Sequence, residues 1–198
     1  MSGTKGEWPK ERDAMMIDLR GCIGCHTCSM ACKAEYEVPL GCVRPWVKPI
    51  EKRRSPHVRK VYLPIFSNHC ERAICTTVGP AKATYRRPEE GIVMVNPHRC
   101  IGFRYWMAAC HYNVRFVSPR YKIVEKCDFC QKRLEQGQLP ACVEACPTQA
   151  MSFGDLNDPN ADIARLISTS TVQVMKPEMG TYPQAYYVEM DVDIVGAR

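Results

Sequence analysis

Four closely spaced cysteines near the beginning of the sequence could bind metal together. Residues 21–32 read GCIGCHTCSMAC, so the thiols of Cys22, Cys25, Cys28 and Cys32 follow a C-x2-C-x2-C-x3-C spacing. Where a protein holds two cubane iron-sulfur clusters, the first three cysteines of such a group bind one cluster and the fourth binds the other. The sequence must therefore supply a second cysteine group to complete both sites.

The cysteine content favours metal ligands over disulfides. The chain has 13 cysteines among 198 residues, which is an odd number, and cysteines two residues apart leave too little chain between them for a favourable disulfide loop. Zinc also binds paired C-x2-C groups, and the last cysteine group, residues 126–151, could form a zinc ribbon by itself. Three thiols at successive x2 spacings followed by one at x3, however, are typical of a cubane cluster.

Several short elements must position these groups. Apolar patterning and turn residues predict strands at 14–19, 61–66, 83–86, 91–95 and 121–125, and helix formers predict helices at 29–37, 128–135 and 160–167. Segment 42–59 is rich in Pro, Arg and Lys, and we expect an irregular surface arm there. Residues 154–198 are punctuated by proline and include no cysteine, so we expect a tail that wraps a partner.

The first cysteine group is repeated later in the chain with two of its ligands replaced. Residues 99–110, RCIGFRYWMAAC, align with residues 21–32. The aligned pairs are Cys22 with Cys100, Cys25 with Phe103, Cys28 with Trp106 and Cys32 with Cys110. The later copy therefore keeps only the first and last thiols of the group.

A second repeat relates residues 67–85 to the last cysteine group. Both contain a C-x3-[C/G]-P-x2-A frame. The aligned pairs are Ser67 with Cys127, Cys70 with Cys130, Cys75 with Cys142 and Gly79 with Cys146. Residues 67–85 thus lack the first and last thiols of their group.

Crossed ligation turns these repeats into four predicted sites. The first site consists of Cys22, Cys25, Cys28 and Cys146, and the second of Cys32, Cys127, Cys130 and Cys142. The third site consists of Ser67, Cys70, Cys75 and Cys110, and the fourth of Gly79, Cys100, Phe103 and Trp106. We expect three clusters in the chain: a 4Fe-4S cluster in each of the first two sites, and a 4Fe-4S or 3Fe-4S cluster in the third, which has three thiols and a hydroxyl. The fourth site keeps one thiol, so we expect no cluster there, with Phe103 and Trp106 filling part of the vacated cavity.

Other candidate ligands lack the required spacing. Cys42 lies in the proline-rich segment and is expected to be a bystander, and Cys100 is interpreted as a relic of the fourth site. His26, His69 and His111 lie beside predicted ligands, and we interpret them as packing or hydrogen-bonding neighbours. No phosphate-binding glycine loop and no Ser/His/Asp arrangement is apparent, so we expect no catalytic residue.

The cysteine groups resemble those of the iron-sulfur electron-transfer subunits of the molybdopterin oxidoreductases, which include dimethyl sulfoxide, polysulfide, thiosulfate and nitrate reductases and sulfite-oxidising complexes. The resemblance covers most of residues 15–153 and rests on MIDLRGCIGCHTCSMAC, HCERAIC, HRCIGFRYWMAACHYNVRF and EKCDFCQKRLEQGQLPACVEACPTQAM. It implies an α+β, double ferredoxin-like fold with irregular insertions. One half would comprise residues 14–40 and 121–153, the other residues 41–120, and an extended C-terminal tail, 154–198, would follow. Members of the family usually have sixteen cysteine ligands, and four of those places are altered here.

The same resemblance implies a non-catalytic subunit. It would pass single electrons between a large molybdopterin subunit, containing molybdenum or tungsten, and a quinone-reactive membrane subunit or a soluble carrier. The alternatives are a stand-alone polyferredoxin-type carrier and an assembly protein with degenerate clusters.

Charge and hydropathy restrict the partners and the compartment. The formal net charge is +6, but a cubane with four thiolates carries about −2 when oxidised, so three clusters would balance the excess and we expect no nucleic-acid binding. We see neither an apolar run of signal-peptide length nor the ~20 apolar residues of a membrane span. The expected location is cytoplasmic or membrane-associated through partners, and periplasmic only after export with a partner.

Overall fold

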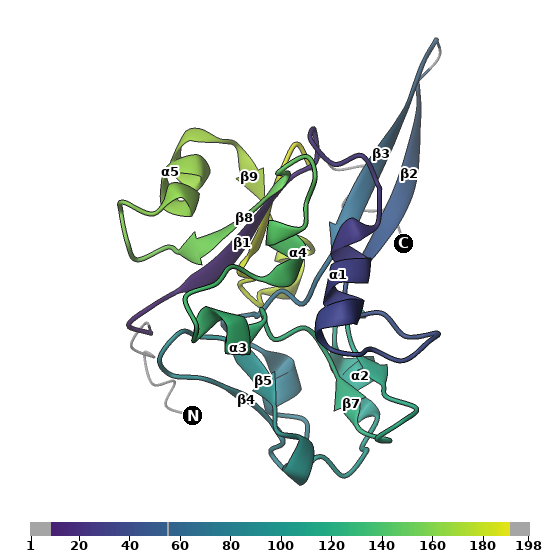
Figure 1. Ribbon diagram of the computed structural model, residues 1–198, viewed down its shortest axis with the longest axis vertical. Coiled ribbons are helices and arrows are strands. Elements are labelled where there is room, and N and C mark those ends of the chain that lie inside the picture. Colours follow the sequence, from purple (N-terminus) through teal and green to yellow (C-terminus); the bar gives the residue numbers. More distant parts are fainter. Residues whose placement is uncertain (1–8, 55, 191–198) are drawn as a thin grey trace.

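Strand β1 (Asp13–Asp18) is an inner strand of a four-stranded sheet in the order β8-β1-β10-β9. It pairs antiparallel with β8 (Met151–Asp155) and parallel with β10 (Ala185–Val188), which in turn pairs antiparallel with β9 (Val172–Gln173). The computed structural model describes residues 9–54 and 56–190, and its ribbon places β1 and β8 side by side above the shorter elements (Figure 1).

The remaining strands form two-stranded hairpins, and the helices lie before, between and after them. Three hairpins pair β2 (Trp46–Arg54) with β3 (His57–Ile65), β4 (Thr84–Arg86) with β5 (Val93–Val95), and β6 (Phe116–Val117) with β7 (Val124–Glu125). The α-helices are α1 (Thr27–Glu35), α2 (Tyr105–Ala109), α3 (Gln131–Leu134), α4 (Ala141–Glu144) and α5 (Asp162–Thr169). Single 3-10 turns cover Ile74–Thr76, Pro97–Arg99 and Pro177–Met179. Within the described residues, no helix is both long and apolar enough to cross a membrane.

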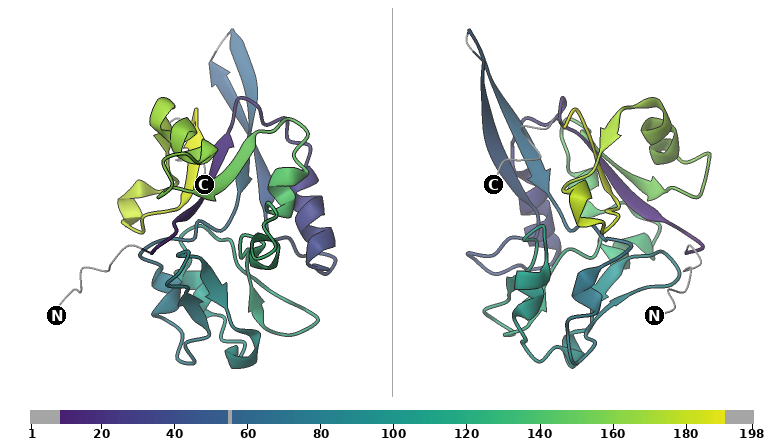
Figure 2. Two further views of the ribbon diagram at one scale, coloured as in Figure 1. Left: turned by 60° about the vertical axis from the view of Figure 1, so that its left-hand side comes forward. Right: turned by 180° about the vertical axis from the view of Figure 1, so that it is seen from behind.

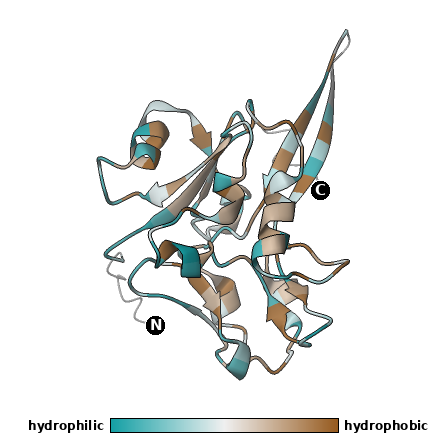
Figure 3. Cartoon of the chain, viewed as in Figure 1, coloured by the Kyte–Doolittle hydropathy of each residue, from teal (hydrophilic) through white to brown (hydrophobic). Residues whose placement is uncertain are grey.

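The predicted strands and helices are confirmed, with shifted ends. The irregular arm expected at 42–59 is wrong, because β2 and β3 form a long hairpin that projects from the body (Figures 1 and 2). Its base is apolar: Val47 and Leu63 are buried in the core, while hydrophilic residues alternate with hydrophobic ones toward its tip (Figure 3). Pro49 lies within β2 opposite Tyr62, and a two-stranded ribbon tolerates proline because each strand has an open edge.

The expected C-terminal tail is also corrected. As far as residue 190, the segment contributes a helix and two strands to the body of the protein, and β10 is an inner strand of the main sheet. Tyr187 is fully buried and its hydroxyl donates to the carbonyl of Pro64 at 3.0 Å. Helix α5 packs Ile163 against the opposite face of the sheet, next to Met16 and Val188. Residues 191–198 lie outside the described part of the chain.

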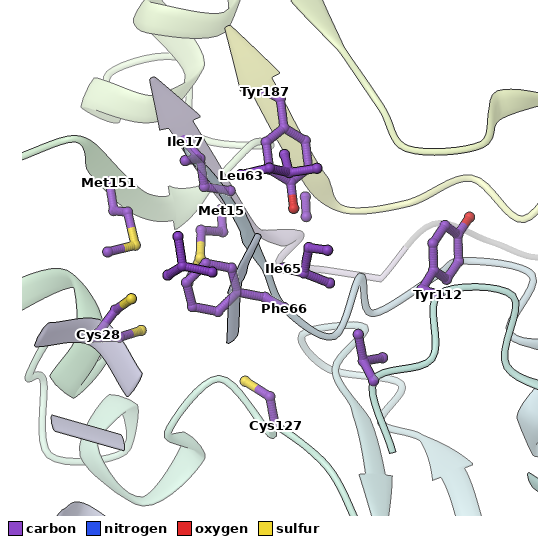
Figure 4. Close-up of a cluster of buried hydrophobic side chains, with 14 of the residues drawn as sticks. Met15, Ile17, Cys28, Leu63, Ile65, Phe66, Tyr112, Cys127, Met151 and Tyr187 are labelled. Carbon is purple, nitrogen blue, oxygen red and sulfur yellow. The ribbon is translucent and has the colours of Figure 1, made fainter. Parts of the chain in front are cut away.

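The main hydrophobic core joins segments that are far apart in sequence. Met15 and Ile17 of β1, Leu63 and Ile65 of β3, and Tyr187 of β10 all belong to one buried cluster. Figure 4 shows Cys28 and Cys127 at its border. The core thus spans both predicted halves and the C-terminal segment, and the division at residues 40, 120 and 153 stays a prediction.

Asp13, the first residue of β1, occupies an unfavourable electrostatic position. It lies opposite Asp155 in the β1-β8 pair. Burial, followed by the charges of Asp155, Glu11 and Glu90, raises the pKa of Asp13 to about 7. From about pH 4 to pH 7 the folded protein therefore retains a proton that the unfolded chain has released, and the free energy of unfolding falls as the pH rises through this range.

We expect Asp13→Asn to raise the free energy of unfolding by about 1–2 kcal/mol at pH 8, because the amide removes the like-charge repulsion without leaving a buried charge. The gain should grow from about pH 4 and level off above about pH 7. Denaturant unfolding of anaerobically purified protein across this range measures it. Asp162→Asn, at an exposed position of α5, is the control, and a gain that does not change with pH would contradict the assignment.

Candidate functional site

The first cysteine group lies on a loop that enters α1. Cys22 and Cys25 precede the helix, and Cys28 and Cys32 lie one turn apart within it, both buried. Gly24 has φ +70°, and a Cβ built there would lie 2.3 Å from the ring of Tyr62. Only glycine satisfies both the left-handed backbone and the close approach of Tyr62, so the loop that spaces Cys22 from Cys25 depends on it.

The four residues of the first site line one cavity. Cys22, Cys25 and Cys28 lie around this cavity together with Cys146, which follows α4. Most of the other lining side chains are apolar. Burial raises the pKa of the Cys28 thiol to about 11. Burial also raises the pKa of Cys22, and the charges of Cys146 and Cys25 raise it further.

The four residues of the second site are also brought together. All four side chains are buried. Burial raises the pKa of the Cys142 thiol, with further contributions from the other three thiols of the site and from Cys28 of the first site. Burial likewise raises the pKa of Cys127 to about 11. The two sites are therefore adjacent, and both depend on α1 lying next to α4 (Figure 1).

A buried arginine that no sequence pattern singles out lies beside the second site. The guanidinium of Arg44 stacks on the ring of Tyr36 at 3.7 Å. It forms ion pairs with Glu125 at 3.3 Å and Asp128 at 3.4 Å, and the Tyr36 hydroxyl donates to Asp128 at 2.6 Å. The positive charge near this site is thus paired with two carboxylates.

The third predicted set lines a cavity of its own. The four residues around this cavity are Ser67, Cys70, Cys75 and Cys110. Burial raises the pKa of Cys70 to about 11, and the charges of Cys75 and Cys110 contribute to the rise. The Ser67 side chain is buried, as a fourth ligand in this place would be.

Polar atoms without partners also surround the third cavity. The side-chain amide of Asn68 and the Nη2 atom of Arg115 are buried and form no hydrogen bond, and both residues line the cavity. Lys126 lines it too, and burial, followed by the charge of Arg115, lowers the pKa of Lys126 to about 8. Buried donors and cations of this kind fit an anionic group such as a thiolate-ligated cluster.

The fourth place is filled by protein. Trp106 is fully buried, and a Cβ at Gly79 would lie 2.2 Å from its Nε1 atom. Cys100 packs at the edge of the small cluster around the indole. Phe103 is 38% exposed and meets Trp106 edge-on, with 6.3 Å between ring centroids. The expectation that both aromatic rings fill the cavity is therefore corrected: Trp106 is buried there, and Phe103 covers it from outside.

The backbone supports the repeat register found in the sequence. Aligned positions share the left-handed conformation that most residues avoid. The pairs are Gly24 with Gly102 (φ 70° and 72°), His69 with Phe129 (φ 40° and 56°), and Lys82 with Gln149 (φ 47° and 51°). The rings of His69 and Phe129 stack on each other at 3.7 Å, so two equivalent positions of the repeat are in direct contact.

The residues beside the predicted ligands make contacts of their own. In the described ranges, no group of three or more His, Cys, Asp or Glu side chains is arranged to hold a single metal ion. His69 Nδ1 accepts a hydrogen bond from the backbone N–H of Val93 at 3.1 Å, in agreement with its interpretation as a neighbour. Cys42 contacts the carbonyl of Val117 at 4.0 Å.

Comparison with known proteins agrees with this geometry. A 4Fe-4S dicluster domain matches residues 58–156, half of the chain. The chain is 42% identical to a tetrathionate reductase subunit of Salmonella typhimurium over 92% of its own length and 74% of that protein. It is 42% identical to Protein NrfC of Escherichia coli K12, covering 89% and 80% of the two proteins. It is 38% identical to a polysulfide reductase chain of Wolinella succinogenes, covering 88% and 92%.

These relatives favour a subunit of a multi-subunit complex over a stand-alone carrier, with catalysis in other subunits. They also support 4Fe-4S clusters as the group that the buried thiols hold. The chain belongs to the family of iron-sulfur subunits that transfer electrons within the molybdopterin oxidoreductases.

Proposed function

We propose that this chain binds three clusters and relays single electrons between a molybdopterin catalytic subunit, with molybdenum or tungsten, and a quinone-reactive membrane subunit or a soluble carrier. The observation that carries the proposal is the contrast between sites: two predicted ligand sets line cavities and a third is mutually buried, whereas Trp106 fills the fourth place. When bound, the clusters supply one-electron redox chemistry. The fold that holds them is, in this proposal, a double ferredoxin-like one.

The protein's own residues bind the clusters and exclude water from them. Eleven thiols and the Ser67 hydroxyl are the ligands: Cys22, Cys25, Cys28 and Cys146 in the first site, Cys32, Cys127, Cys130 and Cys142 in the second, and Cys70, Cys75 and Cys110 with Ser67 in the third. The third site would hold a 4Fe-4S cluster if the Ser67 oxygen binds iron and a 3Fe-4S cluster if it does not. Buried apolar residues such as Ile17 and Met151 line part of the first site and keep water from that side, whereas Cys25 lies at the surface.

Exposed apolar side chains support partner contacts near the two aligned cysteine groups. Ile23 and Ile101 occupy the same position in the repeat, and they are 58% and 68% exposed. Tyr105 is also exposed beside the second of them. Apolar residues at the surface next to cluster sites suit protein partners at both groups, and we expect no nucleic-acid partner. The chain would be cytoplasmic or held at a membrane by its partners, or periplasmic if exported with one.

The number of clusters is the first test. Anaerobically purified chain, alone or with its catalytic partner, should contain about twelve iron atoms and about as much acid-labile sulfide, or about one iron fewer with a 3Fe-4S cluster. Iron and sulfide assays normalised to amino-acid analysis measure it. About eight iron atoms would remove the third cluster, and about sixteen would contradict the whole arrangement.

Single cysteine substitutions test the ligand sets. Cys28→Ala and Cys142→Ala should each lower the iron content by about one to four atoms, because each leaves one site with three thiols, which can hold a 3Fe-4S cluster or none. Cys42→Ala and Cys100→Ala are the matched controls and should retain the full iron content. Loss of iron from Cys100→Ala would instead place a cluster in the fourth site.

The close packing of Trp106 against Gly79 allows the fourth site to be tested by protein stability, without an iron assay. Gly79→Ala should lower the free energy of unfolding by about 1–3 kcal/mol, because the new methyl group overlaps the indole. Adding Trp106→Phe should recover part of this loss, which a double-mutant cycle measures by denaturant unfolding. Strictly additive effects would show that the two positions do not touch.

A further inference from the structure

The third site differs from the other two in its charge. Its cavity is lined by two cationic residues, Arg115 and Lys126, and by no Asp or Glu. The first cavity is lined by no Asp, Glu, Lys or Arg. At the second site, the positive charges of Arg44 and of Lys126, whose Nζ donates to the carbonyl of Cys127, are offset by Glu125 and Asp128. The first cavity thus has no charged side chain, the second site has balanced charges, and the third cavity has a net positive charge.

Arg115 is held at the third cavity without a counter-ion. Its side chain is 5% exposed, its Nη1 donates to the Thr84 hydroxyl at 3.3 Å, and its Nη2 forms no hydrogen bond. In the described part of the chain no carboxylate pairs with it. A buried charge that lacks a partner costs several kcal/mol, so this guanidinium needs an anion beside it, and the adjacent cavity is where one would be bound.

Lys126 supplies the second cation from a different segment. It is 5% exposed, and its Nζ donates to the carbonyls of Val93 and Cys127. These two bonds fix the ammonium between the third cavity, which it lines, and the backbone of the second site at Cys127. Asn68, with an unpartnered buried amide, adds a neutral donor on the same wall.

We propose that Arg115 makes the third site the electron-accepting site of the chain, with Lys126 shared between the second and third sites, so that a cluster bound in the third site has a higher reduction potential than clusters in the first and second sites. This inference rests on the three-cluster function proposed above.

Reduction adds one negative charge to a cluster, and a nearby buried cation stabilises the reduced form more than the oxidised form. The electron gained at the third site is the one lost by a cluster at another site, so no further reactant is needed.

The effect of the ligand atom on the reduction potential can be separated from the effect of the surrounding charge. An oxygen ligand from Ser67 also changes the potential of the third cluster, but it is the same in the parent and in an Arg115 variant. Comparison of these two proteins therefore isolates the guanidinium. Ser67→Cys changes the ligand of one site only, so the cluster signal that it alters identifies the third site.

The test is a redox titration of the full chain, loaded with its clusters, followed by electron paramagnetic resonance. In the parent, the signal assigned to the third site should have the highest midpoint. Arg115→Gln should lower that midpoint potential by at least about 59 mV, which for a one-electron couple is a tenfold loss of electron affinity. The midpoint potentials of the other two clusters should not change. Arg165→Gln removes an exposed arginine on α5 and should leave all three midpoints in place.

Two further variants keep the result interpretable. Arg115→Lys keeps the charge and should preserve most of the high midpoint, and Thr84→Val removes only the hydrogen bond to Arg115, so its midpoint should stay near that of the parent. The inference would be overturned by an unchanged third midpoint in Arg115→Gln, by an equal shift at all sites, or by a third midpoint in the parent that lies below either of the other two. An iron content of about eight in the parent would instead overturn the third cluster itself.

Discussion

The pairing of β1 with β8 is the constraint on which the first two sites depend. The backbone N–H of Asp18, the last residue of β1, donates to the carbonyl of Ala150 at 2.8 Å, just before β8 begins. This contact fixes the loop that carries Cys22 and Cys25 against the loop that carries Cys146. A cubane needs ligands at four corners, and one short loop can reach only three of them. Long-range strand pairing therefore brings the fourth cysteine to the site, which the spacing of the first three cysteines cannot do.

The fourth place shows how side chains of different size can pack where the aligned positions of the first and last cysteine groups carry thiols. A void in this position would destabilise the core. Here the indole of Trp106 occupies the space, and the absence of a Cβ at Gly79 admits it. The two residues are complementary in volume, because one has no side chain where the other has an indole.

Much of the site could be predicted from the sequence, because ligand spacing and an internal repeat are local patterns. The repeat led from Cys28 and Cys32 to Cys146 and Cys142, more than a hundred residues away, and the structure brings these side chains near one another. The hairpin β2-β3 was missed because Pro49 and many charged residues conceal the apolar base of the hairpin. Strand β10 was missed because parallel pairing with β1 leaves no short-range signal. Arg44 and Arg115 were missed for another reason: a single buried cation has no periodicity, and only its neighbours reveal it.

The crossed arrangement of ligands has a consequence for biosynthesis. During translation, Cys22, Cys25 and Cys28 leave the ribosome long before Cys146, and β10, which completes the sheet beside β1, is made later still. With the proposed ligand sets, the first and second sites cannot close before Cys146 has been made. The third set comes from residues 67–110 alone, so it can be enclosed earlier than the others. The thiols of α1 must therefore stay reduced for as long as the intervening hundred or so residues take to be synthesised.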